Sequence, residues 1–286
     1  MRERWKQVGL ILLSALAVAA ALNAAGYLAY KLIGGVFIAI YFTSALASFV
    51  GYLAAVRWIE RRQVTEFSPA ALPALAGGLG GGIALFSVVM AILWVAGVYQ
   101  PHGWGGANRL GLAFAFWLAV AAQEEIIYRG LVFRLLSKVA GTWGALLLSA
   151  VFFGATHAMN PGATAAGLNS VALAGVLLGA LYVVSGRLWL PIGVHWGWNF
   201  AEGSLFGTAV SGSDVGGSLL AGKLSGPALL TGGQFGPEAS IVAVLILLPC
   251  TVYCVWRIAA RGRSEPPIWR AKKAPSPSLS SPLAPP

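Results

Sequence analysis

Long runs of apolar residues recur along this chain, and they constrain its fold more than any other feature. A helix that crosses a membrane needs about 20 mostly apolar residues, and by this measure the chain holds about eight such segments. Hydrophobic residues make up 58% of its 286 residues and charged residues only 10%, whereas soluble domains carry about 25% charged residues. The apolar runs are continuous rather than alternating, which excludes a membrane β-barrel. The sequence therefore predicts an all-α polytopic membrane protein, a bundle of about eight transmembrane helices.

The predicted helices form one transmembrane domain over residues 1–260. We expect the first apolar run to be a retained helix rather than a cleaved signal peptide. A Gly- and Ser-rich loop, 207–238, could be a lid, but we expect a disordered insert. The basic tail, 261–286, is rich in Pro and Ser and is also predicted to be disordered, because it cannot bury enough apolar surface to fold. The predicted spans are 8–28, 32–56, 79–99 (after a short amphipathic approach at 69–76), 110–136, 142–158, 168–185, 190–206 and 239–258.

The basic residues predict how these helices are oriented. With eight spans, nearly all Lys and Arg residues fall on one side of the membrane, and the opposite loops hold little beyond Lys31, Arg109 and Lys223. Loops rich in Lys and Arg stay in the cytoplasm. We therefore expect an integral protein of a bacterial plasma membrane with both termini in the cytoplasm. The net charge of +10 is explained by this topology, and we infer no nucleic-acid partner from it; the lipid bilayer is an expected partner.

Two adjacent carboxylates and an arginine interrupt the fourth apolar run, as Glu124, Glu125 and Arg129. Ionisable groups inside membranes are costly and are functional by default. On a helix, Glu125 and Arg129 share a face and can pair, while Glu124 is turned about 100° away. One carboxylate can thus anchor the arginine while the other stays free for chemistry. The alternative is a purely structural ion-pair cluster between helices.

Two histidines lie inside later predicted spans, each four residues from a possible partner on the same helix face. His157 ends the run that starts at Phe153, and His195 lies four residues before Asn199. Either histidine alone could make a structural hydrogen bond between helices. Together with the two glutamates and Arg129, however, these groups account for nearly all the polar side chains of the later spans. Converging polar groups suit acid/base chemistry.

Peptide hydrolysis needs the groups that this set provides. A carboxylate or an imidazole can accept the proton of the attacking water. An imidazole N–H and an amide NH₂ can donate to the oxyanion that forms. No aspartate lies in a predicted span, since Asp214 belongs to the loop 207–238, and no Ser/His/Asp arrangement is apparent. A serine or aspartyl mechanism is therefore poorly supported.

Three motifs follow one another in the fourth, fifth and seventh predicted spans: Glu-Glu-x-x-x-Arg at 124–129, Phe-x-x-x-His at 153–157 and His-x-x-x-Asn at 195–199. In this order and spacing they resemble the CPBP family of intramembrane proteases. That family comprises type II CAAX prenyl endopeptidases and bacteriocin-processing or immunity homologues, including lysostaphin-resistance-like proteins. The connector Glu60-Arg61-Arg62 with Glu66-Phe67 is also similar to the family's loop before its third core helix. The motif-bearing resemblance covers about 110–206.

The resemblance implies a role for each motif residue. Glu124 and His157 would activate water, and His195 and Asn199 would stabilise the oxyanion. Glu125 and Arg129 would support the site by pairing, with Phe153 as a further supporting residue. The implied fold is a helix bundle with an intramembrane catalytic cavity, and the implied partner is a peptide or protein substrate at the membrane. The implied reaction is endopeptidase cleavage near a membrane-associated end of that substrate, in CAAX-type or bacteriocin-type processing.

Two alternatives stay open at this point. The family is often described as metalloproteases, and Glu124, Glu125, His157 and His195 could hold Zn²⁺, which takes N and O ligands; the favoured mechanism uses glutamate and needs no cofactor. The protein could also be non-catalytic, as a proton-coupled transporter or as an immunity or scaffold protein. In that case the same polar residues would form a relay or a structural network.

Overall fold

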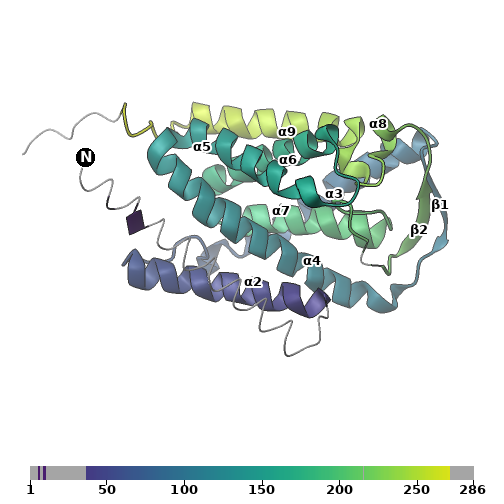
Figure 1. Cartoon of the computed structure of the whole chain (residues 1–286), viewed down its shortest axis with the longest axis horizontal. Coiled ribbons are helices and arrows are strands. Elements are labelled where there is room, and N and C mark those ends of the chain that lie inside the picture. Colours follow the sequence, from purple (N-terminus) through teal and green to yellow (C-terminus); the bar gives the residue numbers. More distant parts are fainter. Residues whose placement is uncertain (1–5, 7–8, 11–36, 215, 271–286) are drawn as a thin grey trace, which may run out of the picture.

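The computed structural model describes residue 6 and residues 9–10, 37–214 and 216–270. Within these residues the chain is mostly helical, and its helices lie side by side along one long axis (Figure 1). The predicted span 8–28 lies outside the described residues except for Gly9 and Leu10. The helices are α2 (Phe37–Ala54), α3 (Pro73–Val95), α4 (Leu110–Glu125), α5 (Arg134–Thr156), α6 (Ala165–Ser185), α7 (Trp189–Phe200), α8 (Ala228–Thr231) and α9 (Ile241–Ala260).

Five of the described helical segments are long and apolar enough to cross a membrane. They confirm an integral membrane protein with a helical fold, while the count of eight spans stays a prediction. Helix α3 begins at Pro73, ahead of the predicted 79, and takes in the second half of the predicted amphipathic approach. The candidate spans are Ala39–Ile59, Pro69–Val95, Ala107–Met159, Ala165–Ser185 and Ile241–Ala260.

The candidate span Ala107–Met159 is 53 residues long and folds back on itself. A π-helical segment, Ile126–Phe133, joins α4 to α5, and the backbone leaves helical geometry at Gly141 (φ 71°, ψ 176°). The Tyr128 hydroxyl lies 2.7 Å from Oγ1 of Thr156, 28 residues further along, although an unbroken helix would separate these residues by about 42 Å. The chain therefore reverses at Gly141, where glycine tolerates the positive φ.

Helices α3 and α7 pack with their backbones in close approach because glycines line the contact. A Cβ atom at Gly82 would lie 2.1 Å from the carbonyl oxygen of Val194, and one at Gly197 would lie 2.2 Å from that of Leu79. The contact fixes α7, which carries His195 and Asn199, against α3.

Helix α7 has only 12 residues and is followed by a π-helical turn, Ala201–Leu205. Because the helix continues through this turn, the two segments together extend about 25 Å at about 1.5 Å per residue, somewhat less than the roughly 30 Å of a hydrocarbon core. His195 therefore lies in the middle of a short helix. From this position its side chain reaches groups on α4, although the helix does not extend across the whole hydrocarbon core.

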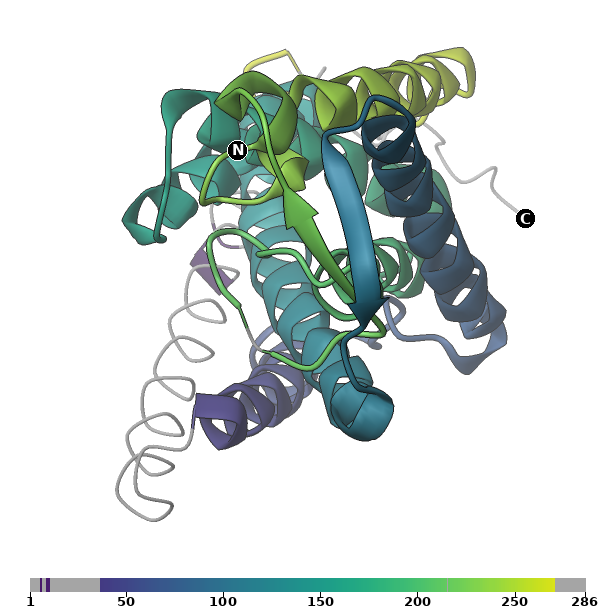
Figure 2. The same ribbon diagram turned by 90° about the vertical axis from the view of Figure 1, so that its right-hand side faces the viewer.

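The described residues of the Gly- and Ser-rich loop, 207–214 and 216–238, are folded against the rest of the chain, so the expectation of a disordered insert was wrong for them. The loop's strand β2 (Leu220–Leu224) pairs antiparallel with β1 (Tyr99–Trp104), which follows α3. Figure 2 shows this two-stranded sheet lying across one end of the helix bundle. The sequence hid this pairing because it joins segments more than 100 residues apart and because glycine and serine have low strand propensity.

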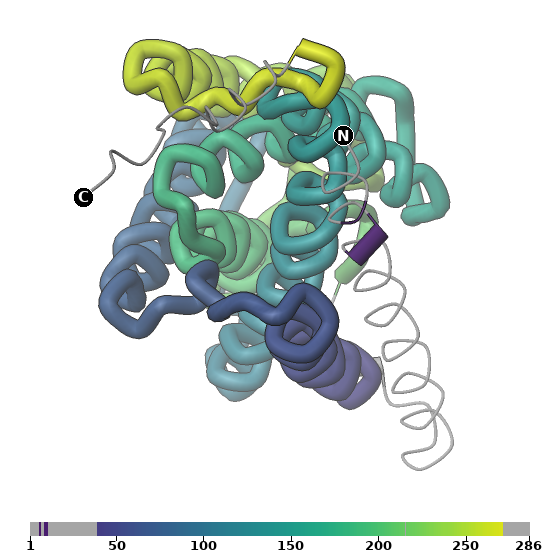
Figure 3. Tube along the Cα trace, turned by 90° about the vertical axis from the view of Figure 1, so that its left-hand side faces the viewer, coloured from purple at the N-terminus to yellow at the C-terminus, as the bar shows by residue number. Residues whose placement is uncertain are grey.

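The opposite end of the bundle, which faces the viewer in Figure 3, holds the connector after α2 and the start of the basic tail. Residues 261–270 pack on the chain reversal at Gly141 within α5, in contrast to the predicted disorder. The amide of Thr142 donates to Glu265 O, and the amide of Ile268 donates to Val139 O, each at 3.0 Å. The remaining tail, 271–286, lies outside the described residues.

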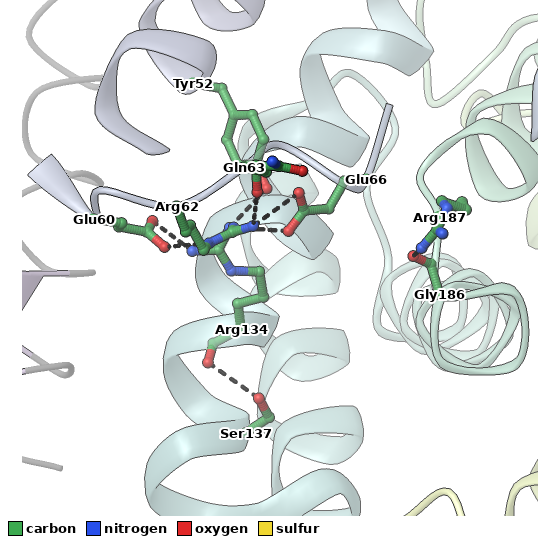
Figure 4. Close-up of polar contacts among 9 residues, drawn as sticks. All are labelled: Tyr52, Glu60, Arg62, Gln63, Glu66, Arg134, Ser137, Gly186 and Arg187. Carbon is green, nitrogen blue, oxygen red and sulfur yellow. Dashed lines mark hydrogen bonds and ion pairs between the residues drawn. The ribbon is translucent and has the colours of Figure 1, made fainter. Parts of the chain in front are cut away.

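The connector carries a network of charged side chains, here called the connector cluster: Glu60, Arg62, Glu66 and Arg134 (Figure 4). Arg62 pairs with Glu66 at 2.7 Å and with Glu60 at 2.8 Å, and Arg134 pairs with Glu60 at 2.5 Å. Next to the cluster, the amide of Leu188 donates to the backbone oxygen of Glu66 at 3.0 Å. This hydrogen bond links the connector to the residue that precedes α7.

Candidate active site

Glu125 is the fixed carboxylate of the Glu-Glu pair. It is fully buried, and its Oε1 accepts hydrogen bonds from Arg129 Nη1 at 2.7 Å and from His195 Nδ1 at 2.9 Å. Arg129 also donates to the backbone oxygen of Gly175 on α6 at 3.1 Å. The ion pair predicted from the helix-face argument is thus present, and it joins α4, α6 and α7 at one point.

Glu124 is the open carboxylate. Its side chain is 25% exposed and makes no hydrogen bond with the described residues. The nearest charged group is His195, whose Nε2 lies 3.8 Å from Glu124 Oε2, beyond hydrogen-bonding distance but close enough for electrostatic attraction. Adjacent carboxylates therefore have different environments, one neutralised by Arg129 and the other facing a pocket.

The ring of Phe153 packs against the charged and imidazole groups of the site. Its centroid lies 4.9 Å from the ring of His157 and 6.1 Å from the ring of His195, and the Arg129 guanidinium sits 4.6 Å from it. Such packing restricts how the two imidazoles can turn. Phe153 therefore supports the positions of both histidines.

His157 has a defined tautomer in its neutral form. Its Nδ1 lies 2.8 Å from the backbone oxygen of Phe153, and a carbonyl oxygen can only accept, so Nδ1 carries the proton. Nε2 makes no hydrogen bond within the described part of the chain and is left as an acceptor. The neutral ring thus presents a basic nitrogen.

The four predicted catalytic residues line adjoining pockets. One, here called the Glu124 pocket, is lined by all four, together with Ser211 and residues of α2 and α4. The other, here called the Glu238 pocket, is lined by His157, His195, Asn199 and Ser211 as well as by Glu238. Asn199 is buried, and its amide makes no hydrogen bond with any residue described. The amide is therefore available as a donor.

Sequence reasoning missed a second group of polar residues beside the site. Ser211, which has a left-handed backbone (φ 47°), donates to Glu238 Oε1 from both its amide (2.8 Å) and its hydroxyl (2.6 Å). Glu202 accepts from the Glu238 amide at 3.0 Å. Glu202 could have been found, because it lies seven residues after His195 and so on nearly the same helix face. Ser211 and Glu238 gave no signal, since they sit in the loop predicted to be disordered.

Two carboxylates outside the candidate membrane spans have shifted pKa values. Burial raises the pKa of Glu238 above its ordinary value. Burial acts in the same direction on Glu66, but hydrogen bonding to Arg62 and the charges of Arg62 and Arg134 outweigh it and hold the Glu66 pKa below its usual value. Hydrogen bonds from Ser211 and positive charge on His157 and His195 act against this rise in the Glu238 pKa without outweighing burial. Glu238 thus lacks the arginine partners that stabilise Glu66 as an anion.

The predicted zinc ligands do not fit a metal site. Three or more side chains would have to converge on one point at about 2 Å, and no such group of His, Cys, Asp or Glu exists among the residues searched, which are the described ones. Glu125 Oε1 is engaged by Arg129 and His195 instead. The geometry does not support a metalloprotease site, and we derive no step through a metal.

The family model described as type II CAAX prenyl endopeptidase Rce1-like matches residues 106–201. The match covers all three motifs and confirms the family resemblance that they indicated. Together with the apolar helices, it supports an intramembrane endopeptidase of the CAAX type in general terms. The comparisons with curated proteins and with solved structures gave no match.

Proposed function

We propose that this member of the CPBP family of intramembrane proteases hydrolyses a peptide bond near a membrane-associated end of its substrate, with Glu124 as the general base. The observation that carries the proposal is the contrast between the two glutamates. Glu125 is buried and paired with Arg129, whereas Glu124 faces the pocket that His157, His195 and Asn199 also line. A carboxylate without hydrogen-bonding partners can take a proton from water.

In the proposed reaction, the Glu124 carboxylate accepts a proton as water attacks the carbonyl carbon of the scissile bond. Nε2 of His157, the free acceptor of its ring, orients this water and shares the proton. The protonated carboxyl group then gives the proton to the nitrogen of the leaving amine. The products are a new carboxyl end and a new amino end, and Glu124 returns to its starting form.

The oxyanion of the tetrahedral intermediate would be stabilised by Asn199 and His195. The Asn199 amide has its NH₂ group available. His195 donates its Nδ1 proton to Glu125, so it can donate from Nε2 only when the ring carries both protons. The carboxylates of Glu124 and Glu125, at 3.8 Å and 2.9 Å, flank that positive charge. Donors placed before the reaction lower the barrier because they need no reorganisation.

The substrate class follows from the family alone, and we propose CAAX-type or bacteriocin-type processing of a membrane-anchored peptide. We also propose that both termini are cytoplasmic. The connector cluster would then face the cytoplasm, and the β1–β2 sheet would lie on the outer side.

The experiment that tests this function compares peptide termini in membranes from cells that carry the wild-type protein or Glu124→Gln at matched abundance. New termini that appear only with the wild type would establish proteolysis and identify the substrate. Identical termini, with both proteins folded and the substrate supplied by overexpressing small membrane-anchored proteins, would favour a relay or scaffold role.

A further inference from the structure

Glu238 is a buried carboxylate that the proposed mechanism does not use, although it adjoins the reacting groups. It is only 9% exposed and lines the Glu238 pocket together with His157, His195 and Asn199. Three of the four proposed catalytic residues therefore share a pocket with it. Any substrate group that enters this pocket belongs to a residue next to the scissile bond.

One of the two oxygens of the Glu238 carboxylate has no hydrogen-bonding partner among the described residues. Both hydrogen bonds from Ser211 go to Oε1, and Oε2 accepts none from the described residues. No lysine or arginine of the described chain pairs with Glu238. A buried carboxylate without compensation is costly, and a cation compensates it better than a neutral donor does. The missing partner is thus best supplied by a positively charged ligand group.

The rest of the pocket favours a ligand side chain that is narrow and mostly apolar along its length. Its walls come from α5, α6, α7 and α9, and they include Val171, Leu178, Trp198 and Leu247. The cavity measures about 50 Å³, which holds roughly four water-sized groups at about 10–15 Å³ each. That space suits an unbranched side chain rather than an aromatic one.

The position of Glu238 also suits a charged ligand. It precedes α9 and lies just outside the candidate span Ile241–Ala260. Glu202 fixes the Glu238 backbone at this place through the amide hydrogen bond. A charge near the end of a span costs less than one at the membrane centre.

We propose that the Glu238 pocket is a specificity site for an unbranched basic side chain, of which lysine is the natural example, on the substrate residue adjoining the scissile bond. The proposal rests on the proposed endopeptidase function. Glu238 would act by binding this side chain, with Ser211 holding the carboxylate in place.

The test uses the full-length protein in liposomes with lipid-anchored peptides that are randomised at the six residues before the anchor. Mass spectrometry of the products gives the cleavage position and the residues on either side of it. A matched peptide pair with lysine or norleucine at the selected position then gives a ratio of kcat/KM values. Lysine should be enriched at one flanking position and preferred by roughly ten- to a hundredfold, as for a partly desolvated charge pair.

Glu238→Gln keeps an acceptor for Ser211 but removes the charge, so it should bring the lysine-to-norleucine ratio close to one. Asp214→Asn removes the same charge from an exposed residue of the same loop and should leave the ratio unchanged. Equal or better cleavage of the norleucine peptide by the wild type would overturn the proposal, whether or not the Glu238 variant folds. A lysine preference that persists in folded Glu238→Gln would also overturn it. If no peptide is cleaved above the level of Glu124→Gln, the proposed function itself fails.

Discussion

The carboxylate of Glu125 lies 2.9 Å from Nδ1 of His195, and this contact joins two motifs that are 70 residues apart in the chain. Because the same oxygen also accepts from Arg129, we propose that Glu125 serves structure and that its neighbour Glu124 is left for chemistry. The two adjacent glutamates should therefore respond differently to the same substitution.

Glu125→Gln should destabilise the protein by about 3–5 kcal/mol, because it leaves Arg129 buried without its counter-charge. Glu124→Gln should change the free energy of unfolding by less than about 0.5 kcal/mol, since Glu124 makes no hydrogen bond with the described residues. Thermal unfolding of both variants in the same detergent measures the difference. Equal losses of stability would contradict the assigned division of roles.

Gly82→Ala should lower the melting temperature and the activity together. The added Cβ would lie 2.1 Å from the backbone oxygen of Val194, so α3 and α7 would have to separate and His195 would move. Gly81→Ala is the matched control, because its Cβ would meet nothing within 4 Å, and it should be neutral or stabilise the helix by up to about 1 kcal/mol. Similar melting temperatures for the two variants would show that the close helix contact is unimportant.

The connector cluster should lose stability in acid. The pKa of Glu66 is lowered in the folded state, so its contribution is present above the unfolded-state pKa and is lost as pH falls through the folded-state pKa. The melting temperature should therefore drop below about pH 4.3. Glu66→Gln should cost about 2 kcal/mol at pH 7 and reduce the acid-dependent part of the loss.

Glu265→Gln is the control for that measurement. Glu265 pairs only loosely with Lys138, at 3.9 Å, and both side chains are largely exposed. Its acid response should match that of the wild type. An unchanged acid response in Glu66→Gln would remove Glu66 as the cause.

The orientation can be read from single cysteines at the two ends of the bundle. With Cys250 and Cys254 replaced by alanine, Lys223→Cys on strand β2 should react with a membrane-impermeant thiol reagent in intact cells. Glu265→Cys, after α9, should react only once the membrane is opened. The reverse pattern would place the termini outside and contradict the positive-inside assignment.

The sequence was sufficient to predict features that depend on local spacing. Apolar length located the helices, and the spacing of four residues predicted the Glu125–Arg129 pair. The three motifs also indicated a family that the match over residues 106–201 supports. These features could be predicted because each depends on residues within one helix turn or one span.

Features that depend on distant contacts could not be predicted in this way. The order of the loop 207–238 comes from β1, more than 100 residues earlier, and from the hydrogen bonds of Ser211 to Glu238. Residues 261–270 are ordered because they pack on the turn at Thr142. Composition describes what a segment can bury by itself, whereas these segments are held by surfaces that other parts of the chain provide.

The most direct test of the central role of Glu124 is the rate of peptide cleavage by purified protein in liposomes, with wild type and Glu124→Gln at matched amounts and matched melting temperatures. Removal of a general base should lower kcat by about 10²–10⁴-fold. The account predicts a loss in that range without a loss of folding. Cleavage by Glu124→Gln at a rate close to that of the wild type would contradict it.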